Sequence, residues 1–165
     1  MFQLRNHQNT VIDILSKNRK GQVIVPTGGG KTMCMIEDAK KVSGTVVVVA
    51  PRILLAEQLS SEFLEILDNV SVMHVHSGET THFSSTKASD VYMWDLHTRG
   101  DKIIFTTYHS LHRIQESHIH VDTIYFDEAH NAIQKNFIEA VEWFSICADR
   151  CYFFTATPKH SNTPM

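Results

Sequence analysis

The chain has 165 residues, of which 42% are hydrophobic and 20% are charged, and its formal net charge is −3. This composition is typical of one globular domain with a sizeable core, and no apolar run reaches the roughly 20 residues of a membrane helix. Since the chain is not strongly basic, any binding of nucleic acid would depend on a local surface. The N-terminal sequence Met-Phe-Gln-Leu-Arg-Asn-His-Gln lacks the apolar core of a signal peptide, so we expect an intracellular, unsecreted protein.

The first predicted element is a helix over residues 4–18. Its apolar residues share one face: Leu4, Val11, Ile12 and Leu15. Gln8 falls on the same face, and Arg5 lies one turn before it. A glutamine within an apolar stripe needs a hydrogen-bond partner, and two interpretations stay open. Gln8 is either a solvated residue at the boundary of the stripe or an amide that reads adenine, which it suits because it donates and accepts at once.

The next segment, Val23-Ile-Val-Pro-Thr-Gly-Gly-Gly-Lys-Thr32, has the pattern of a phosphate-binding loop between a strand over 22–25 and a helix over 33–41. Its three glycines allow the backbone N–H groups to point at an anion, and the helix adds the positive end of its dipole. Lys31 can then reach the terminal phosphates, and Thr32 can offer its hydroxyl to Mg²⁺. The alternative is a glycine-rich turn that merely precedes Lys-Thr, since Val25 stands where the generic pattern has glycine.

Strands and helices alternate through the rest of the chain. Further strands are predicted over 45–50, 70–75, 102–107, 121–126 and 151–155, and further helices over 52–67, 109–116 and 132–146. The segment 77–100 is predicted to be the least structured, although 91–96 could form a short element. This alternation predicts an α/β fold with a mostly parallel central sheet and helices on both faces. Ligands bind at the carboxyl ends of the strands in such folds.

A second strong signal is Ile124-Tyr-Phe-Asp-Glu-Ala-His130, in which an apolar strand ends in two adjacent carboxylates. Asp127 can hold Mg²⁺ opposite Thr32, and Glu128 can orient or deprotonate the water that attacks the γ-phosphate. Polar residues at a strand end are common, but their position downstream of a phosphate-binding loop favours a hydrolytic site. Lys31, Asp127 and Glu128 are therefore the predicted catalytic residues, with ATP and Mg²⁺ as cofactors.

The histidines and cysteines point to no other metal site. His112, His118 and His120 lie near one another in sequence, but no cysteine or carboxylate shares a ligand-like spacing with them. We therefore expect the eleven histidines to be scattered over the surface. The three cysteines form no Cys-x-x-Cys pair, which favours reduced thiols in a cytosol-like compartment.

As a set, these segments resemble the motifs of superfamily-two DEAD/DEAH-type helicases and translocases. The segments 26–32, 127–130 (Asp-Glu-Ala-His) and 155–157 (Thr-Ala-Thr) resemble motifs I, II and III, and Leu4-Arg-Asn-His-Gln8 resembles the adenine-recognising Q motif. Residues 50–58 resemble motif Ia, and residues 106–111 resemble motif Ib or Ic. Motif I of this family begins with Pro-Thr-Gly, so Val25 is no departure from it. The resemblance covers nearly the whole chain and implies the first, N-terminal RecA-like motor domain.

The resemblance implies a role for each matching position. Nucleotide binding would fall to Arg5, Gln8, Pro26, Thr27, Gly28, Gly29, Gly30, Lys31 and Thr32. His130, Thr155 and Thr157 would couple the nucleotide state to strand binding. Arg52, Thr106 and Thr107 would contact a nucleic-acid backbone largely independently of its sequence, although Arg52 could equally be a solvated residue at a helix start.

Motors of this family have two such domains with ATP between them, and the second supplies an arginine finger. Because the sequence ends at Met165, just past motif III, we expect residues 1–165 to form one RecA-like domain with weak or no hydrolysis by itself. The second domain would come from the complete protein or in trans. Thr155-Ala-Thr-Pro158 together with Asp-Glu-Ala-His favours DNA over RNA as the partner. A nucleotide-dependent binding module without turnover is the alternative, whereas the adjacent Asp127 and Glu128 argue against a small kinase.

Overall fold

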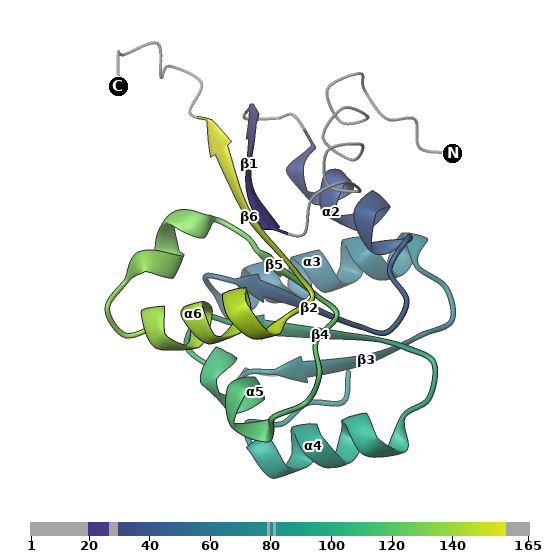
Figure 1. Ribbon diagram of the computed structural model, residues 1–165. Coiled ribbons are helices and arrows are strands. Elements are labelled where there is room, and N and C mark those ends of the chain that lie inside the picture. The colour runs from purple at the N-terminus through teal and green to yellow at the C-terminus, as the bar shows by residue number, and fades with distance from the viewer. Residues whose placement is uncertain (1–19, 27–29, 79, 81, 158–165) are drawn as a thin grey trace.

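The computed structural model describes residues 20–26, 30–78, 80 and 82–157, and within them six parallel strands form one sheet (Figure 1). The strands are β1 (Lys20–Pro26), β2 (Thr45–Ala50), β3 (Val70–Val75), β4 (Asp101–Thr107), β5 (Thr123–Phe126) and β6 (Arg150–Thr157). The helices are α2 (Lys31–Ala39), α3 (Ile53–Ile66), α4 (Ala88–His97), α5 (Leu111–Ser117), α6 (Ile138–Cys147) and the 3-10 helix η1 (Ala129–Ile133). The predicted α/β class is confirmed. The helix predicted over 4–18 lies outside the described residues.

The order of the strands in the sheet is β1-β6-β5-β2-β4-β3. All six residues of the central strand β2 are buried, as its unbroken run of β-branched residues predicts. In the register, Val49 of β2 lies beside Phe126 of β5, and Pro26 of β1 lies beside Thr157 of β6. Because all strands run in the same direction, the carboxyl ends of β1, β2, β5 and β6 lie along one edge of the sheet.

Two hydrophobic cores cover the two faces of this sheet. Val46 and Val48 of β2 pack with α2 and α3, whereas Val47 and Val49 pack with α4, α5 and α6 (Figure 1). The alternation follows from the period of two along a strand. Burial of a valine side chain of this kind contributes about 1.5–3 kcal/mol, so the valine run accounts for much of the attachment of both helical layers.

The segment 77–100 contains a regular helix, α4, which is longer than the element predicted at 91–96. Its buried residue is Val91, while Tyr92, Met93 and Leu96 are exposed. Because α4 lacks an apolar stripe with helical spacing, the sequence pattern gave no clear helix signal here.

The helix predicted over 132–146 is wrong in its first part. The chain forms η1 directly after Glu128 and then breaks at Gln134, whose backbone is extended, before α6 begins at Ile138. Strand β5 begins two residues later than predicted, because Asp122 uses its N–H and its carboxylate to bind the backbone of Thr45.

The three cysteines are free, as expected, and two of them are buried. Burial raises the pKa of Cys34 to about 11 and that of Cys151 to about 12, so both remain protonated and unreactive at neutral pH. Within the described residues, no helix combines the length and hydrophobicity needed to cross a membrane.

Candidate functional site

The carboxyl edge of the sheet brings Lys31 together with Asp127 and Glu128. Lys31 is the first residue of α2, and the two acids follow β5. Its Nζ lies 2.7 Å from Oδ1 of Asp127 and donates a hydrogen bond to Oε1 of Glu128, although Lys31 and Glu128 are 97 positions apart in sequence. The residues predicted to form one site are therefore in direct contact. Their catalytic roles remain a prediction.

Burial and charge oppose each other at this contact. Burial alone would lower the pKa of Lys31, but the two carboxylates together raise it, so the ammonium stays charged. Burial raises the pKa of Asp127, which is 4% exposed, and the attraction of Lys31 offsets this only in part. Because an unpaired charge would be costly here, Lys31 is the group that allows Asp127 to be ionised in the protein alone.

The residues at this position fit a Mg²⁺ ion. Oδ1 of Asp127 is buried and has no aligned hydrogen-bond donor among the described residues, since Lys31 lies near it as an ion-pair partner without hydrogen-bond geometry. A carboxylate oxygen is a ligand that Mg²⁺ prefers, usually together with water and phosphate oxygens. Thr32, in the first turn of α2, is partly buried and follows Lys31 directly.

Tyr108 holds the backbone of Asp127 in place, and the sequence analysis did not identify it. Its buried hydroxyl donates a 2.8 Å hydrogen bond to the backbone carbonyl of Asp127, and the N–H of Asp127 donates to the carbonyl of Val49. Burial raises the pKa of Tyr108 well above its usual range, so the hydroxyl keeps its proton and remains a donor. The only sequence signal was its position just after a strand that ends at the same edge.

Two residues at this edge have left-handed backbone conformations. Gly30 has φ 77° and precedes α2, where glycine adopts this conformation without steric cost. Glu128 has φ 51°, which is uncommon for a residue with a side chain, and the Asn131 side chain donates to its carbonyl. Such local strain is typical of functional positions, and here it turns Glu128 back toward Lys31.

Other predicted nucleotide-binding residues are only partly described. Arg5, Gln8, Thr27, Gly28 and Gly29 lie outside the described residues. The backbone of Pro26 ends β1 beside Thr157, the last residue of β6, so motifs I and III adjoin at the sheet edge.

His130 and Thr155 line one cavity of about 500 Å³ on the face covered by α6. His130 is exposed and follows the acidic pair, whereas Thr155 lies on β6. Ile133, which is 76% exposed, lines the same cavity. Two of the three residues assigned to coupling, His130 and Thr155, thus line one cavity, whereas the side chain of Thr157 lies outside what the structure describes.

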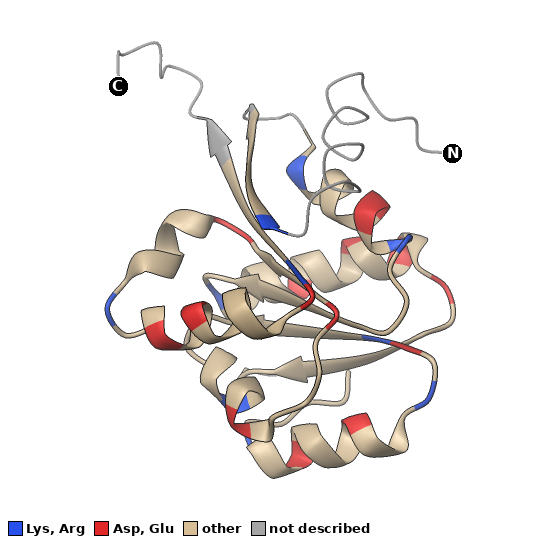
Figure 2. Cartoon of the chain, viewed as in Figure 1, with Lys and Arg blue, Asp and Glu red and all other residues tan. Residues whose placement is uncertain are grey.

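The three residues expected to contact nucleic acid differ in exposure. Arg52 is exposed and lies directly before α3. Thr106 is fully buried and its hydroxyl donates to the carbonyl of Val75 at 2.7 Å, and Thr107 is 4% exposed. The Thr106 side chain therefore holds β4 against β3 and is not available to a ligand in this conformation. The Lys and Arg residues of the described chain are spread over several elements rather than gathered on one (Figure 2).

The expectation that the histidines are scattered over the surface is correct for His112, His118 and His120, which are exposed. It is wrong for His74 and His76, which are buried at the end of β3. The spacing of two positions between these histidines gave no indication that the carboxylate of Glu57, from α3, would lie beside them.

Comparisons with known proteins agree on the family. A family model described as "Type III restriction enzyme, res subunit" matches residues 1–160. The chain is 28% identical over 146 residues to "Putative helicase 7" of Sulfolobus islandicus filamentous virus (isolate Iceland/Hveragerdi), covering 86% of this chain and 23% of that protein. It is 28% identical over 145 residues to "Probable ATP-dependent RNA helicase ddx52" of Dictyostelium discoideum, covering 82% of this chain and 21% of that protein. The chain thus spans less than a quarter of the length of these relatives.

Solved structures share the fold. A nuclease-deletion mutant of the Type ISP restriction-modification enzyme LlaGI in complex with a DNA substrate mimic superposes with a TM-score of 0.78 and 23% identity, covering 96% of this chain and 18% of that one. The helicase domain of Pyrococcus furiosus Hef superposes with a TM-score of 0.69 and 19% identity, covering 97% of this chain and 34% of that one. The chain belongs to the family of the type III restriction enzyme res subunit and has the fold of the N-terminal RecA-like domain of superfamily-two helicases.

Proposed function

We propose that this chain is the ATP-binding half of a motor that hydrolyses ATP and moves along nucleic acid. The observation that carries the proposal is the contact of Lys31 with Asp127 and Glu128 at the carboxyl edge of the sheet. A lysine at the start of a helix and two carboxylates at the end of another strand of the same sheet are the groups that phosphoryl transfer to water requires.

In this proposal, Lys31 exchanges its partners when a nucleotide binds. In the protein alone its ammonium pairs with both carboxylates, and with ATP present it would turn to the β- and γ-phosphates. Thr32 and Asp127 would hold Mg²⁺, which would supply positive charge against the phosphates. Glu128 loses its lysine partner and is then free to orient the attacking water and accept its proton. Arg5 and Gln8 recognise adenine, and residues 26–30 enclose the phosphates.

His130, Thr155 and Thr157 transmit the nucleotide state in this proposal, which the cavity shared by His130 and Thr155 supports. Arg52, which is exposed directly before α3, contacts the nucleic-acid backbone. Thr106 and Thr107 are buried and support this edge of the sheet. We favour DNA as the polymer because of the family of the res subunit and the Thr-Ala-Thr-Pro sequence. A second RecA-like domain, in the complete protein or in trans, supplies the arginine finger, and the free thiols fit an intracellular protein.

The test is ATP hydrolysis by the chain alone, measured with single-stranded DNA, duplex DNA and RNA and compared with nucleotide binding under the same conditions. We expect ATP to bind and turnover to be very low with every polymer until the second domain is supplied, after which DNA stimulates turnover more than RNA. ATP binding without turnover in the completed, DNA-bound motor would instead show a binding module. Strong stimulation of the chain alone would mean that a second copy provides the finger.

A further inference from the structure

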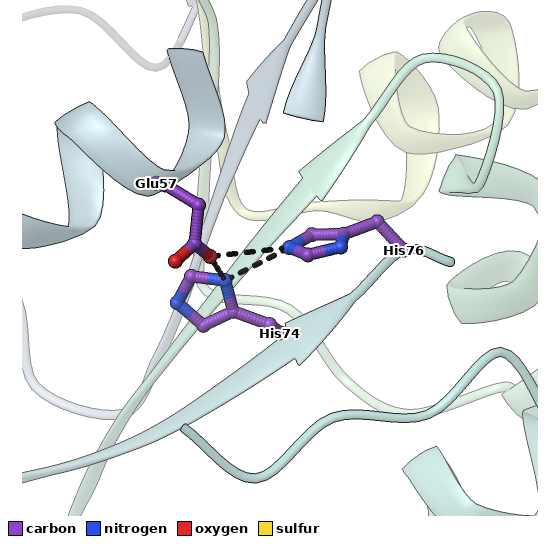
Figure 3. Close-up of side chains that lie close together, drawn as sticks. All are labelled: Glu57, His74 and His76. Atoms are coloured by element: carbon purple, nitrogen blue, oxygen red, sulfur yellow. Dashed lines mark hydrogen bonds and ion pairs between the residues drawn. The ribbon is translucent and has the colours of Figure 1, made fainter. Parts of the chain in front are cut away.

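A second cluster of chemically competent side chains lies away from the nucleotide site. Glu57 projects from α3, His74 lies on β3, and His76 follows the end of β3, so that the three side chains point toward one another (Figure 3). Because His74 and His76 are two positions apart, they project from the same side of the extended chain. Both histidines are buried, whereas Glu57 is 31% exposed and forms the solvent side of the cluster.

The donor atoms of the cluster have the spacing of metal ligands. Oε2 of Glu57 lies 2.7 Å from Nδ1 of His74 and 3.3 Å from Nε2 of His76, and the two nitrogens are 3.1 Å apart. These separations place the three atoms on a circle of radius about 1.8 Å, so an ion with bonds of about 2.0 Å would lie about 1 Å outside their plane. Two imidazoles and one carboxylate suit Zn²⁺ and related transition metals better than Mg²⁺.

We propose that Glu57, His74 and His76 bind a divalent transition-metal ion of the zinc class, which joins helix α3 to the end of strand β3. Water would complete a four-coordinate site on the exposed side of Glu57. Since α3 begins directly after Arg52, an ion here would fix the helix whose start carries this exposed cation. The site is independent of the proposed ATP chemistry.

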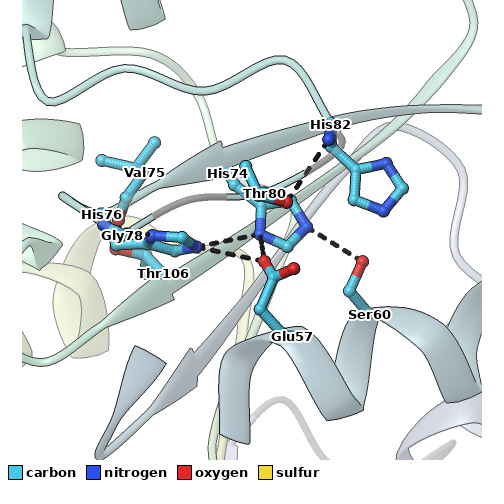
Figure 4. A network of polar contacts seen from close by, with 9 residues as sticks. All are labelled: Glu57, Ser60, His74, Val75, His76, Gly78, Thr80, His82 and Thr106. Carbon is cyan, nitrogen blue, oxygen red and sulfur yellow. Dashed lines mark hydrogen bonds and ion pairs between the residues drawn. The ribbon is translucent and has the colours of Figure 1, made fainter. Parts of the chain in front are cut away.

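Neighbouring groups hold the histidine rings in place. Oγ of Ser60 lies 2.9 Å from Nε2 of His74, the ring of His82 stacks on that of His74 at 4.8 Å, and the N–H of Gly78 donates to Nδ1 of His76 (Figure 4). A metal-binding histidine usually donates from its far nitrogen to such a partner, and Ser60 can accept from His74 in this way. In the metal-bound form, His74 donates from Nε2 to Ser60 and leaves the lone pair of Nδ1 for the ion.

The alternative is a metal-free network in which protons take the place of the ion. The N–H of Gly78 puts the proton of a neutral His76 on Nε2, directed at Glu57. If His74 also carries its proton on Nδ1, two N–H groups share one carboxylate oxygen. If it does not, a nitrogen lone pair faces that oxygen at 2.7 Å. The carboxylate oxygen can accept both hydrogen bonds of the first arrangement. A metal ion removes the repulsion of the second arrangement, but its binding moves the His76 proton to Nδ1 and breaks the hydrogen bond from Gly78.

The test is a titration of the metal-stripped protein with Zn²⁺ in competition with a chromophoric chelator, in the absence of nucleotide. We expect one ion per chain, with binding about 100-fold weaker in His76→Gln and in Glu57→Gln, and about 10-fold weaker in Ser60→Ala. One control should bind as the natural chain does: His120→Gln, from an exposed cluster with two aspartates. No stoichiometric binding, or equal binding by His76→Gln, would overturn the site.

A second measurement on the unsubstituted protein keeps the test decisive if a variant does not fold. The amide resonance of Gly78 should shift strongly with saturating Zn²⁺, because its hydrogen bond to His76 is lost. The exposed Gly100 serves as a reference amide that should not move. A Gly78 resonance that is unchanged at saturation would show that the ion is not bound by Nε2 of His76.

Discussion

Tyr108 donates its hydroxyl to the backbone carbonyl of Asp127 at 2.8 Å, and thereby links the end of β4 to the end of β5. The bond is buried and lies one residue before Glu128, whose backbone is left-handed. Tyr108 thus lies between the strand end expected to face nucleic acid and the carboxylate expected to activate water. We therefore expect Tyr108 to position the acidic pair rather than to take part in the chemistry.

Tyr108→Phe removes only this hydroxyl and leaves the carbonyl of Asp127 without its partner. We expect the free energy of unfolding to fall by about 1–2 kcal/mol in urea denaturation, because a buried acceptor loses its hydrogen bond. In the complete motor, polymer-stimulated turnover should fall while the affinity for ATP changes little. Tyr92→Phe, at a tyrosine that is 49% exposed, is the control for both measurements. Full turnover in Tyr108→Phe would reduce the residue to a packing role.

Glu128→Gln in the complete motor should bind ATP and stall. The amide can neither accept a proton nor attract Lys31 as the carboxylate does, so we expect turnover to fall by about 10²–10⁴-fold with ATP binding retained. Single-turnover hydrolysis separates this result from slow product release. Glu139→Gln, an exposed glutamate on α6, should hydrolyse normally. Normal turnover by Glu128→Gln would remove Glu128 from the mechanism.

The ion pair between Asp38 and Arg150 lies at the start of β6, away from the nucleotide site, and we expect it to serve stability. Asp38 of α2 is buried and accepts hydrogen bonds from Tyr125 and, at 2.8 Å, from Arg150. Asp38→Ala leaves a cation and a hydroxyl without this partner, so we expect a loss of about 3–5 kcal/mol in unfolding free energy. The exposed Asp68→Ala should cost less than about 0.5 kcal/mol. A loss below about 1 kcal/mol for Asp38→Ala would mean that solvent replaces the missing carboxylate.

Gln8 and Arg5 precede the described residues, so their role in reading adenine stays a prediction. Gln8→Ala should bring the affinities for ATP and GTP closer together, because an amide that donates and accepts distinguishes the two base edges. Competition binding with both nucleotides measures the ratio. An unchanged preference would show that Gln8 is a solvated residue, and Gln3→Ala is a nearby control.

The sequence was sufficient for features that depend on local pattern. The run Thr45–Ala50 predicted a central strand, and the segments around Lys31 and Asp127 predicted a shared edge, because parallel strands bring their ends together. Apart from this shared edge, contacts between side chains of distant segments could not be predicted. Tyr108 meets Asp127 through the tertiary fold, and Glu57 approaches His74 and His76 only after α3 packs against the sheet. Helix α4 was underestimated because its outer residues are apolar and exposed.

The most direct test of the nucleotide site is calorimetry of Mg²⁺-ATP binding to the protein and to Lys31→Ala. We predict that the natural chain binds with one site and that Lys31→Ala loses measurable binding, because no other described group occupies the position of its ammonium beside Asp127 and Glu128. Lys40→Ala, at the exposed end of the same helix, should bind as the natural chain does. Tight ATP binding retained by a folded Lys31→Ala would contradict a phosphate-binding role for this loop.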